Sequence, residues 1–247
     1  MKTARDIKRS KRRSSTIPQI AIAGYTNAGK SSLINAMTGA GVLVEDALFA
    51  TLDPTTRRAE LADGRAVVFT DTVGFVRHLP TQLVESFRST LEEVIEADLV
   101  LHVVDGSDPF PLKQIAAVND VIADIVREQG AEAPPEIVVV NKIDAADPLT
   151  LAELRHAVDD CVFVSAHTGE GIDELEARVE LFLNSLDSHV RLSIPFTRGD
   201  IVARIHEQGT VLAETYDISG TVLDVRLPPS LVAELEEFRV EQTHGND

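Results

Sequence analysis

The stretch Gly24-Tyr25-Thr26-Asn27-Ala28-Gly29-Lys30-Ser31 decides the fold class of this 247-residue chain. It matches the phosphate-loop pattern G-x-x-x-x-G-K-[ST] at every defined position. The apolar residues 20–23 before it predict a buried strand, and residues 32–37 after it are typical of the first turns of a helix. A chance glycine-rich turn is the competing interpretation, and this flanking strand and helix disfavour it. The stretch therefore predicts an α/β P-loop fold, in which backbone N–H groups surround a phosphate.

Polar residues at the ends of this loop and of a second strand predict the phosphate chemistry. Lys30 is expected to reach the β- and γ-phosphates of a nucleotide, and the Ser31 hydroxyl to bind Mg²⁺. Asp71-Thr72-Val73-Gly74 follows a predicted strand at residues 66–70. Its carboxylate is expected to hold Mg²⁺ through water, and the Gly74 N–H to meet the γ-phosphate. The same residues also form an ordinary turn at a strand end, and the functional interpretation adds to that one.

A third motif predicts which base is bound. Asn141-Lys142-Ile143-Asp144 follows the β-branched run at residues 137–140. An Asp carboxylate there can accept hydrogen bonds from the N1–H and the exocyclic amine of guanine, whereas adenine has no such donor pair. Ser165-Ala166 follows another short apolar strand and is expected to support the base from the other side. Either motif alone suits an exposed turn, but after a phosphate loop the pair predicts a guanine site.

Composition narrows the class of protein. No apolar run approaches the roughly 20 residues that span a bilayer, and the basic start is not followed by a secretory signal. The single Cys161 excludes an intrachain disulfide, so a cytoplasmic location is expected. Residues 1–13 carry a net charge of +6 in a chain of net charge −17, which leaves −23 for the remainder. This asymmetry is typical either of an arm directed at nucleic acid or of a solvated helical linker.

The pattern of strands and helices divides the chain into four predicted regions. Residues 1–16 form a basic helical linker or arm, and residues 17–188 form a P-loop G domain with a mostly parallel sheet and helices on both faces. Residues 189–240 form a small C-terminal α/β domain containing a hairpin around Ser219-Gly220 and a last helix lined by Leu231, Leu235 and Phe238. Residues 241–247 are predicted to be disordered.

Beyond these motifs, the chain resembles the HflX family of ribosome-associated GTPases. The resemblance is carried by GYTNAGKSSL at 24–33, LFATLDPTTR at 48–57, DTVGFVR at 71–77, LPTQLVESFRSTLEE at 79–93 and ADLVLHVV at 97–104, together with NKID and SAHTGEG. It implies a G domain with one antiparallel strand, followed by a small C-terminal domain. It also implies GTP hydrolysis with Mg²⁺, stimulated by the large ribosomal subunit, and a role in rescuing or splitting stalled ribosomes under stress.

The resemblance has one departure and one open assignment. Family members usually carry a further N-terminal domain before a basic linker, and this sequence starts inside what resembles that linker. The switch-one Mg²⁺ ligand falls on Thr51, with Thr55 and Thr56 as nearby rivals. The catalytic group is not assigned, because Phe75 follows Gly74 where many GTPases have the Gln that orients water.

The predicted partners are GTP or GDP, the large ribosomal subunit and its RNA, and the protein is expected to be a monomer without a membrane span. A nucleotide-dependent ribosome assembly or docking factor with minimal turnover is the alternative. An ATP-dependent phosphotransferase is disfavoured by Asp144. The predicted nucleotide-contacting residues are Gly24, Tyr25, Thr26, Asn27, Ala28, Gly29, Lys30, Ser31, Ser32, Phe49, Ala50, Thr51, Leu52, Asp53, Asp71, Thr72, Val73, Gly74, Asn141, Lys142, Ile143, Asp144, Ser165, Ala166 and His167.

Overall fold

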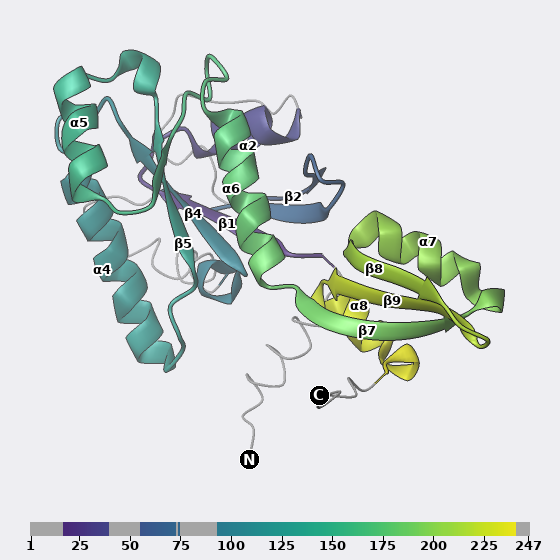
Figure 1. Ribbon diagram of the computed structural model, residues 1–247. Helices are drawn as coiled ribbons and strands as arrows, with labels where there is room; N and C mark the ends of the chain where they lie inside the picture. Colours follow the sequence, from purple (N-terminus) through teal and green to yellow (C-terminus); the bar gives the residue numbers. More distant parts are fainter. Residues whose placement is uncertain (1–16, 40–54, 73, 75–92, 241–247) are drawn as a thin grey trace. The chain divides into compact units, whose positions relative to one another are not determined.

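The computed structural model describes residues 17–39, 55–72, 74 and 93–240, which form two compact units (Figure 1). The larger unit consists of Pro18–Leu61 and Ala66–Arg178. The described part of the smaller unit consists of Ile17, Ala62–Arg65 and residues 179–240. The predicted basic arm and the predicted disordered tail lie outside the described residues.

The larger unit is built on a six-stranded sheet whose order is β2-β3-β1-β4-β5-β6. Its elements are β1 (Gln19–Gly24), α2 (Lys30–Thr38), β2 (Thr55–Glu60), β3 (Ala66–Asp71), β4 (Leu99–Asp105), α4 (Pro111–Gln129), β5 (Glu136–Asn141), the 3₁₀ turn η2 (Ile143–Ala145), α5 (Pro148–Ala157), β6 (Cys161–Phe163) and α6 (Ile172–Ser185), which continues into the smaller unit. β2 runs antiparallel to β3, and every other neighbouring pair is parallel. The predicted α/β fold with a mostly parallel sheet is confirmed.

The central strands are mostly apolar, because helices cover both faces of the sheet. β1 and β4 are buried almost end to end, as expected for parallel strands between two helical layers. Val118 and Ile122 of α4 pack against Ala21 and Val100. In Figure 1, α4 and α5 lie together on one side of the sheet, with α2 and α6 on the other. The carboxyl ends of β1, β3, β4 and β5 therefore meet at one edge, where a ligand of such a sheet binds.

One histidine lies inside this core. His102 of β4 is 1% exposed, and its Nδ1 lies 2.9 Å from Glu136 Oε1 on the neighbouring strand. The lone histidine of an apolar strand is more often a hydrogen-bonded core residue than a ligand, and this geometry confirms that interpretation.

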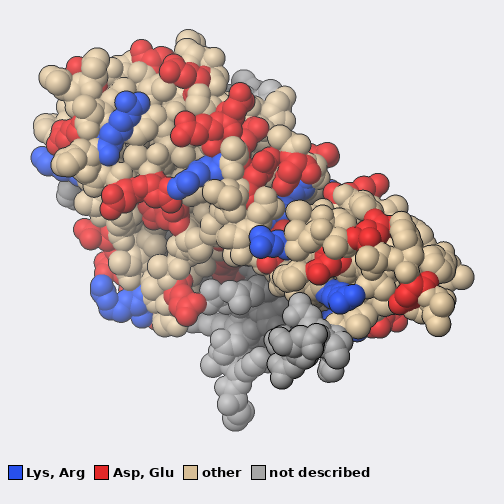
Figure 2. Space-filling model, viewed as in Figure 1, with Lys and Arg blue, Asp and Glu red and all other residues tan. Residues whose placement is uncertain are grey.

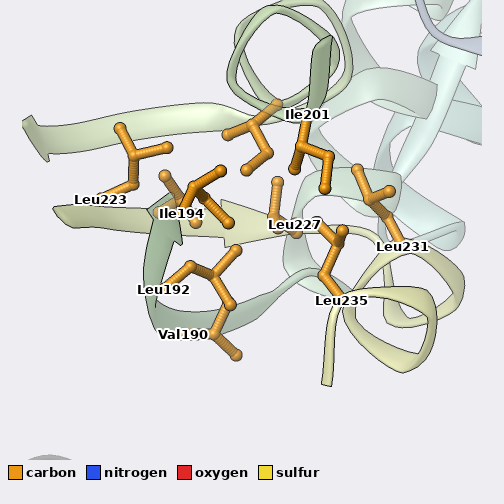
Figure 3. Packing of buried hydrophobic residues seen from close by; sticks show 10 residues of the cluster. Val190, Leu192, Ile194, Ile201, Leu223, Leu227, Leu231 and Leu235 are labelled. Atoms are coloured by element: carbon orange, nitrogen blue, oxygen red, sulfur yellow. The ribbon is translucent and has the colours of Figure 1, made fainter. Parts of the chain in front are cut away.

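The smaller unit is an antiparallel three-stranded sheet, of order β7-β9-β8, with helices packed on one face. Its elements are β7 (Ser188–Pro195), the 3₁₀ turn η3 (Phe196–Arg198), α7 (Gly199–Gln208), β8 (Thr210–Tyr216), β9 (Gly220–Leu227), α8 (Pro229–Glu234) and the 3₁₀ turn η4 (Glu236–Phe238). The alternate residues of β7 and β9 point inward and meet Ile201, Ile205, Leu231 and Leu235 (Figure 3). The core is aliphatic and closely packed.

Two local predictions for this unit have different outcomes. The hairpin around Ser219-Gly220 is confirmed, and Asp217 Oδ1 accepts hydrogen bonds from the N–H groups of both residues at 2.6 and 3.0 Å. The single last helix is wrong, since α8 ends at Glu234 and η4 carries Phe238 in a separate 3₁₀ turn.

The turn between β2 and β3 belongs to the smaller unit, and Arg65 links it to two residues of that unit. The Arg65 guanidinium donates to both carboxylate oxygens of Asp187, at 3.1 and 2.7 Å, and to Asn184 Oδ1 at 2.8 Å. The side chains of Arg65 and Asp187 are 12% and 2% exposed. A bidentate pair of this kind is directional and shielded from solvent.

The face shown in Figure 2 is mostly acidic or uncharged, and basic side chains occur on it only in scattered places. This agrees with the net charge of −17. In the part of the chain that the structure describes, no helix has the length and apolar character needed to cross a membrane.

Candidate nucleotide-binding site

The phosphate loop joins β1 to α2 at the carboxyl edge of the six-stranded sheet. Gly29 precedes the helix with φ 89°, and a Cβ atom there would lie 2.3 Å from the Asn141 side-chain nitrogen. Glycine is therefore required both by its backbone conformation and by the closeness of the base motif. Among the residues that the structure describes, no side chain caps the N-terminus of α2, and the first turn of this helix holds no acidic residue. The first N–H groups of this helix are thus left for an anion.

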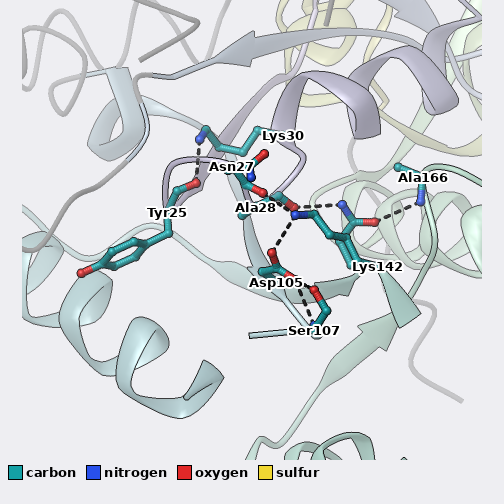
Figure 4. Close-up of polar contacts among 9 residues, drawn as sticks. Tyr25, Asn27, Ala28, Lys30, Asp105, Ser107, Lys142 and Ala166 are labelled. Atoms are coloured by element: carbon teal, nitrogen blue, oxygen red, sulfur yellow. Dashed lines mark hydrogen bonds and ion pairs between the residues drawn. The ribbon is translucent and has the colours of Figure 1, made fainter. Parts of the chain in front are cut away.

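Lys30 is the first residue of α2, and its buried charge is the main feature of the phosphate loop. It is 7% exposed, and its ammonium donates to the Tyr25 carbonyl oxygen at 3.0 Å (Figure 4). Burial lowers the pKa of Lys30 to about 8, and the nearby Asp71 carboxylate opposes that shift. The buried Lys30 ammonium is poorly solvated by water. The oxygen atoms of a bound phosphate would stabilise its charge instead.

Ser31 and Asp71 are 40 residues apart in the sequence and are in contact in the structure. The Ser31 hydroxyl donates to Asp71 Oδ2 at 2.6 Å. Both offer hard oxygen atoms, which is the ligand type that Mg²⁺ prefers, and Mg²⁺ usually completes its shell with water and phosphate. The pair therefore fits a Mg²⁺ site shared with a nucleotide. Within residues 17–39, 55–72, 74 and 93–240, no group of three or more His, Cys, Asp or Glu forms a dedicated metal cage.

Thr72 and Gly74 follow Asp71 and differ in role. The Thr72 side chain anchors its strand, and the Gly74 backbone comes close to the phosphate loop. The Thr72 hydroxyl donates to the Ile22 carbonyl oxygen at 2.6 Å, so this side chain ties β3 to β1. A Cβ atom on Gly74 would lie 2.7 Å from Thr26 Cα, which shows that its backbone lies against the phosphate loop. Val73 and Phe75 lie outside the described residues, as do Phe49, Ala50, Thr51, Leu52 and Asp53 with the predicted switch-one ligand.

The base motif is tied to the phosphate loop by Asn141, the last residue of β5. This side chain is 2% exposed. Its amide nitrogen donates to the Ala28 carbonyl oxygen at 2.9 Å, and its amide oxygen accepts from the Ala166 N–H at 3.0 Å. One buried side chain thus joins three of the predicted nucleotide segments.

Asp144 presents the predicted base-reading carboxylate. Its Oδ1 accepts from the Ser165 hydroxyl at 2.6 Å, and this hydrogen bond is the main reason why the pKa of Asp144 is lowered. His167 Nδ1 lies 3.7 Å from the other oxygen, Oδ2. The carboxylate is therefore held ionised at neutral pH as a hydrogen-bond acceptor.

One residue beside the site was missed by the motif analysis. Asp105 ends β4 and accepts a hydrogen bond from the Lys142 ammonium, which also donates to the Asn27 carbonyl oxygen, both at 2.7 Å. The available signal was its position, since it is a polar residue directly after a buried strand that neighbours β1 and β5.

Comparison with known proteins places the chain among nucleotide-dependent switches. The family model described as "50S ribosome-binding GTPase" matches residues 19–142, which is half of the chain and covers the phosphate loop and the start of the base motif. The chain belongs to this family. The helix-capped sheet and the site geometry given above agree with that membership.

Within the family, the resemblance to HflX proteins is confirmed. The chain is 42% identical over 231 residues to GTPase HflX of Gluconacetobacter diazotrophicus, which covers 94% of this chain and 50% of that protein. It is 39% identical over 224 residues to GTPase HflX of Escherichia coli, which covers 89% of this chain and 51% of that protein. The chain thus spans about half the length of these curated relatives.

Solved structures resemble the G-domain fold. A GTP-binding protein from Sulfolobus solfataricus, in complex with GDP, is 29% identical with a TM-score of 0.50, covering 72% of this chain and 57% of that one. Aquifex aeolicus Era, bound to GDP and aluminium fluoride, has a TM-score of 0.57 at 22% identity, covering 68% and 57%, and this likeness shows the fold alone.

Proposed function

We propose that this chain binds GTP with Mg²⁺, hydrolyses it to GDP and phosphate, and does so in association with the large ribosomal subunit. The observation that carries the proposal is the convergence of Lys30, the Ser31–Asp71 pair and Asp144 at one edge of the six-stranded sheet. These residues supply a phosphate-binding cation, hard oxygen ligands and a guanine-reading carboxylate, respectively. Their chemistry matches the three parts of a metal-bound guanosine triphosphate.

The phosphate end of the site is organised by charge and by backbone donors. The buried Lys30 ammonium and the uncapped α2 N-terminus both favour a dense negative charge. Ser31 and Asp71 hold Mg²⁺, which when bound neutralises the charge that develops on the β- and γ-phosphates. The Gly74 backbone lies next to Thr26 of the phosphate loop, which supports the proposal that its N–H meets the terminal phosphate.

The base-binding part of the site distinguishes guanine from adenine by the positions of their hydrogen-bond donors and acceptors. The ionised Asp144 carboxylate accepts from the N1–H and the 2-amino group of guanine. Adenine has an acceptor at N1 and no 2-amino group, so it would leave this carboxylate without donors. Asn141 holds Ala166 in place, and the Ala166 backbone supports the same base.

Hydrolysis by the chain alone is expected to be slow. Many GTPases orient the attacking water with a Gln directly after the Asp-x-x-Gly motif. Phe75 stands at that position, and a benzyl group offers no hydrogen bond. A partner that supplies or orders a water-positioning group would therefore raise the turnover rate, and the large ribosomal subunit is the proposed partner.

Family membership supports the ribosomal partner, and the charge of the chain limits how it binds. The exposed surface is acidic overall, and phosphate contacts need local positive charge. The basic residues 1–13 are the proposed contact with ribosomal RNA. The proposal extends to a cytoplasmic monomer that acts in the stress-related rescue or splitting of ribosomes.

Steady-state GTP turnover with and without purified large subunits tests the proposal. We expect a low basal rate that rises when subunits are added, and Lys30→Ala should abolish both rates in a folded protein. Pelleting with subunits under GDP and a non-hydrolysable GTP analogue should show nucleotide-dependent association. Association without stimulated turnover would instead support a nucleotide-dependent assembly or docking factor. Absence of both GTP binding and turnover would contradict the proposal.

A further inference from the structure

The two carboxylate oxygens of Asp105 accept hydrogen bonds from two different residues. Oδ1 accepts from the Ser107 N–H at 2.9 Å and from the Ser107 hydroxyl at 2.5 Å, which fixes the carboxylate in a turn of its own loop. Oδ2 accepts only one contact among the described residues, from the Lys142 ammonium at 2.7 Å. The carboxylate is thus immobilised by one oxygen and directed at Lys142 by the other (Figure 4).

Lys142 connects three segments that are far apart in the sequence. Its ammonium donates to Asp105 at the end of β4 and to the Asn27 carbonyl oxygen in the phosphate loop, while its backbone belongs to the base motif. Asn27 and Lys142 both have positive φ, of 62° and 63°. Non-glycine residues in this region need support from their surroundings, and the shared ammonium contact joins these two positions.

A lysine ammonium is a point charge on a flexible stem, so its position depends on what holds it. The other carboxylate that feels the charge of Lys142 is Asp144, the proposed base reader. If the Asp105 carboxylate were removed, the ammonium would lose its fixed partner and would be drawn toward Asp144. It would then compete with the donors of guanine and would release the Asn27 carbonyl.

We propose that Asp105 is a positioning residue for guanine nucleotide: it holds the Lys142 ammonium on the phosphate loop and away from Asp144. This inference rests on the proposed function and adds a residue to that same site. It predicts that Asp105 slows nucleotide release without touching the nucleotide.

The decisive variant is Asp105→Asn, because it keeps the hydrogen bond of the turn with Ser107 and removes the negative charge that faces Lys142. The Asn amide oxygen still accepts from the Ser107 N–H, which places the amide NH₂ toward the Lys142 ammonium, donor against donor. We expect GDP to dissociate roughly tenfold faster from Asp105→Asn and from Asp105→Ala, as for the loss of one charge-assisted hydrogen bond. Stopped-flow release of a fluorescent GDP measures this rate. If Asp105→Asn kept the wild-type rate while Asp105→Ala did not, the role would be that of the turn alone, and the proposal would be overturned.

A double-mutant cycle tests whether Asp105 acts through Lys142. In a Lys142→Met background, Asp105→Ala should change the GDP release rate by less than about twofold, because the ammonium it positions is gone. An undiminished tenfold effect in that background would refute the proposal. The matched control is Asp108→Ala, which removes an acceptor of the Phe110 N–H at 2.7 Å in the same loop and should leave GDP release unchanged.

A readout without nucleotide separates this inference from the proposed function. In ¹⁵N-labelled wild-type protein, the held Lys142 ammonium should give a slowly exchanging NMR signal, assigned by its loss in Lys142→Met. That signal should be lost in Asp105→Asn and kept in Asp108→Ala. If wild type bound no GDP, the proposed function would fail while this contact could still be verified. If GDP bound but the ammonium signal were the same in wild type and Asp105→Asn, only the present inference would fail.

Discussion

Lys30 of the larger unit and Arg65 of the smaller unit are both cations that are largely shielded from water. Their surroundings differ in whether a carboxylate pairs with the charge. Arg65, in the turn of the smaller unit, donates to Asp187 and Asn184 through short hydrogen bonds. Lys30, in the phosphate loop of the larger unit, donates to a backbone carbonyl, and burial lowers its pKa to about 8. The first cation is compensated within the protein, whereas the second is the one that we propose binds phosphate.

The same contrast extends to the two cores. Among the described residues of the larger unit, the buried polar residues are Lys30, Thr70, Asp71, Thr72, His102, Asn141 and Ser165, most of which lie at or beside the proposed site. Among the described residues of the smaller unit, the buried polar residues are Thr221 and Ser230, beside an aliphatic core. Buried polar residues are thus concentrated in the larger unit, where we propose that the nucleotide binds.

The largest expected effect is on base recognition. Asp144→Asn replaces an acceptor by an amide that can donate to the 2-oxo group of xanthine. We expect GDP affinity to fall by about a thousandfold, as for two hydrogen bonds to a charged group, and XDP affinity to rise. Competition titrations with GDP and XDP measure both changes. Unchanged discrimination would show that Asp144 does not read the base.

The next effect concerns the compensated cation. Arg65→Ala leaves the Asp187 carboxylate, 2% exposed, without its bidentate partner. The loss of one partner of a buried pair costs about 3–5 kcal/mol of unfolding free energy. Urea unfolding should show this loss, and the GDP affinity of the folded variant should stay within about twofold of wild type. A large loss of GDP affinity would contradict the claim that Arg65 stabilises the fold without contributing to nucleotide binding.

Lys30→Met should change stability in the opposite direction. A shift from 10.5 to about 8 corresponds to about 3 kcal/mol, so removing the charge should stabilise the nucleotide-free protein by an amount of that order at pH 7. The unfolded chain takes up the proton first as pH falls from 10.5 toward 8, so wild type loses stability over that window and the full penalty applies below it. The advantage of Lys30→Met should therefore shrink above pH 8.

Urea unfolding without nucleotide, at pH 7 and about pH 9.5, measures this difference. The variant should also lose most of its Mg²⁺·GTP affinity. Equal or lower stability of Lys30→Met at pH 7 would show that the lysine is already compensated, as Arg65 is.

The smallest effect is expected for an exposed pair of the smaller unit. Arg204 donates to Glu234 Oε2 at 2.6 Å, with both side chains well exposed. Arg204→Ala should cost about 1 kcal/mol or less, and 0.5 M salt should reduce that difference further. A loss as large as that for Arg65→Ala would mean that burial does not separate the two pairs.

The motifs could be predicted because local spacing and strand ends determine them. The phosphate loop requires a glycine before a helix, and Lys30, Ser31, Asp71 and Asn141 meet because parallel strands bring their carboxyl ends together. By contrast, β2 has the sequence TTRRAE, which carries no apolar alternation. It forms an edge strand through its pairing with β3, and only the family resemblance implied an antiparallel strand there.

Contacts that depend on tertiary placement could not be predicted. Asp105 lies outside every motif, and its contact with Lys142 needs the register of β4 beside β5. The pairing of Arg65 with Asp187 spans 122 residues and has no local signature. The break between α8 and η4 was also missed, because Leu231, Leu235 and Phe238 repeat at helical spacing even though the chain turns at Leu235.

Amide hydrogen exchange with Mg²⁺·GDP and with Mg²⁺·ADP tests the central claim most directly. We predict that GDP protects amides of the phosphate loop at residues 25–31 and of the base motifs at 141–144 and 165–167. ADP at the same concentration should protect none of them, and the strands β7, β8 and β9 should exchange alike in all samples. Equal protection by the two nucleotides, or protection confined to the three-stranded sheet, would contradict a guanine site at the edge of the larger unit.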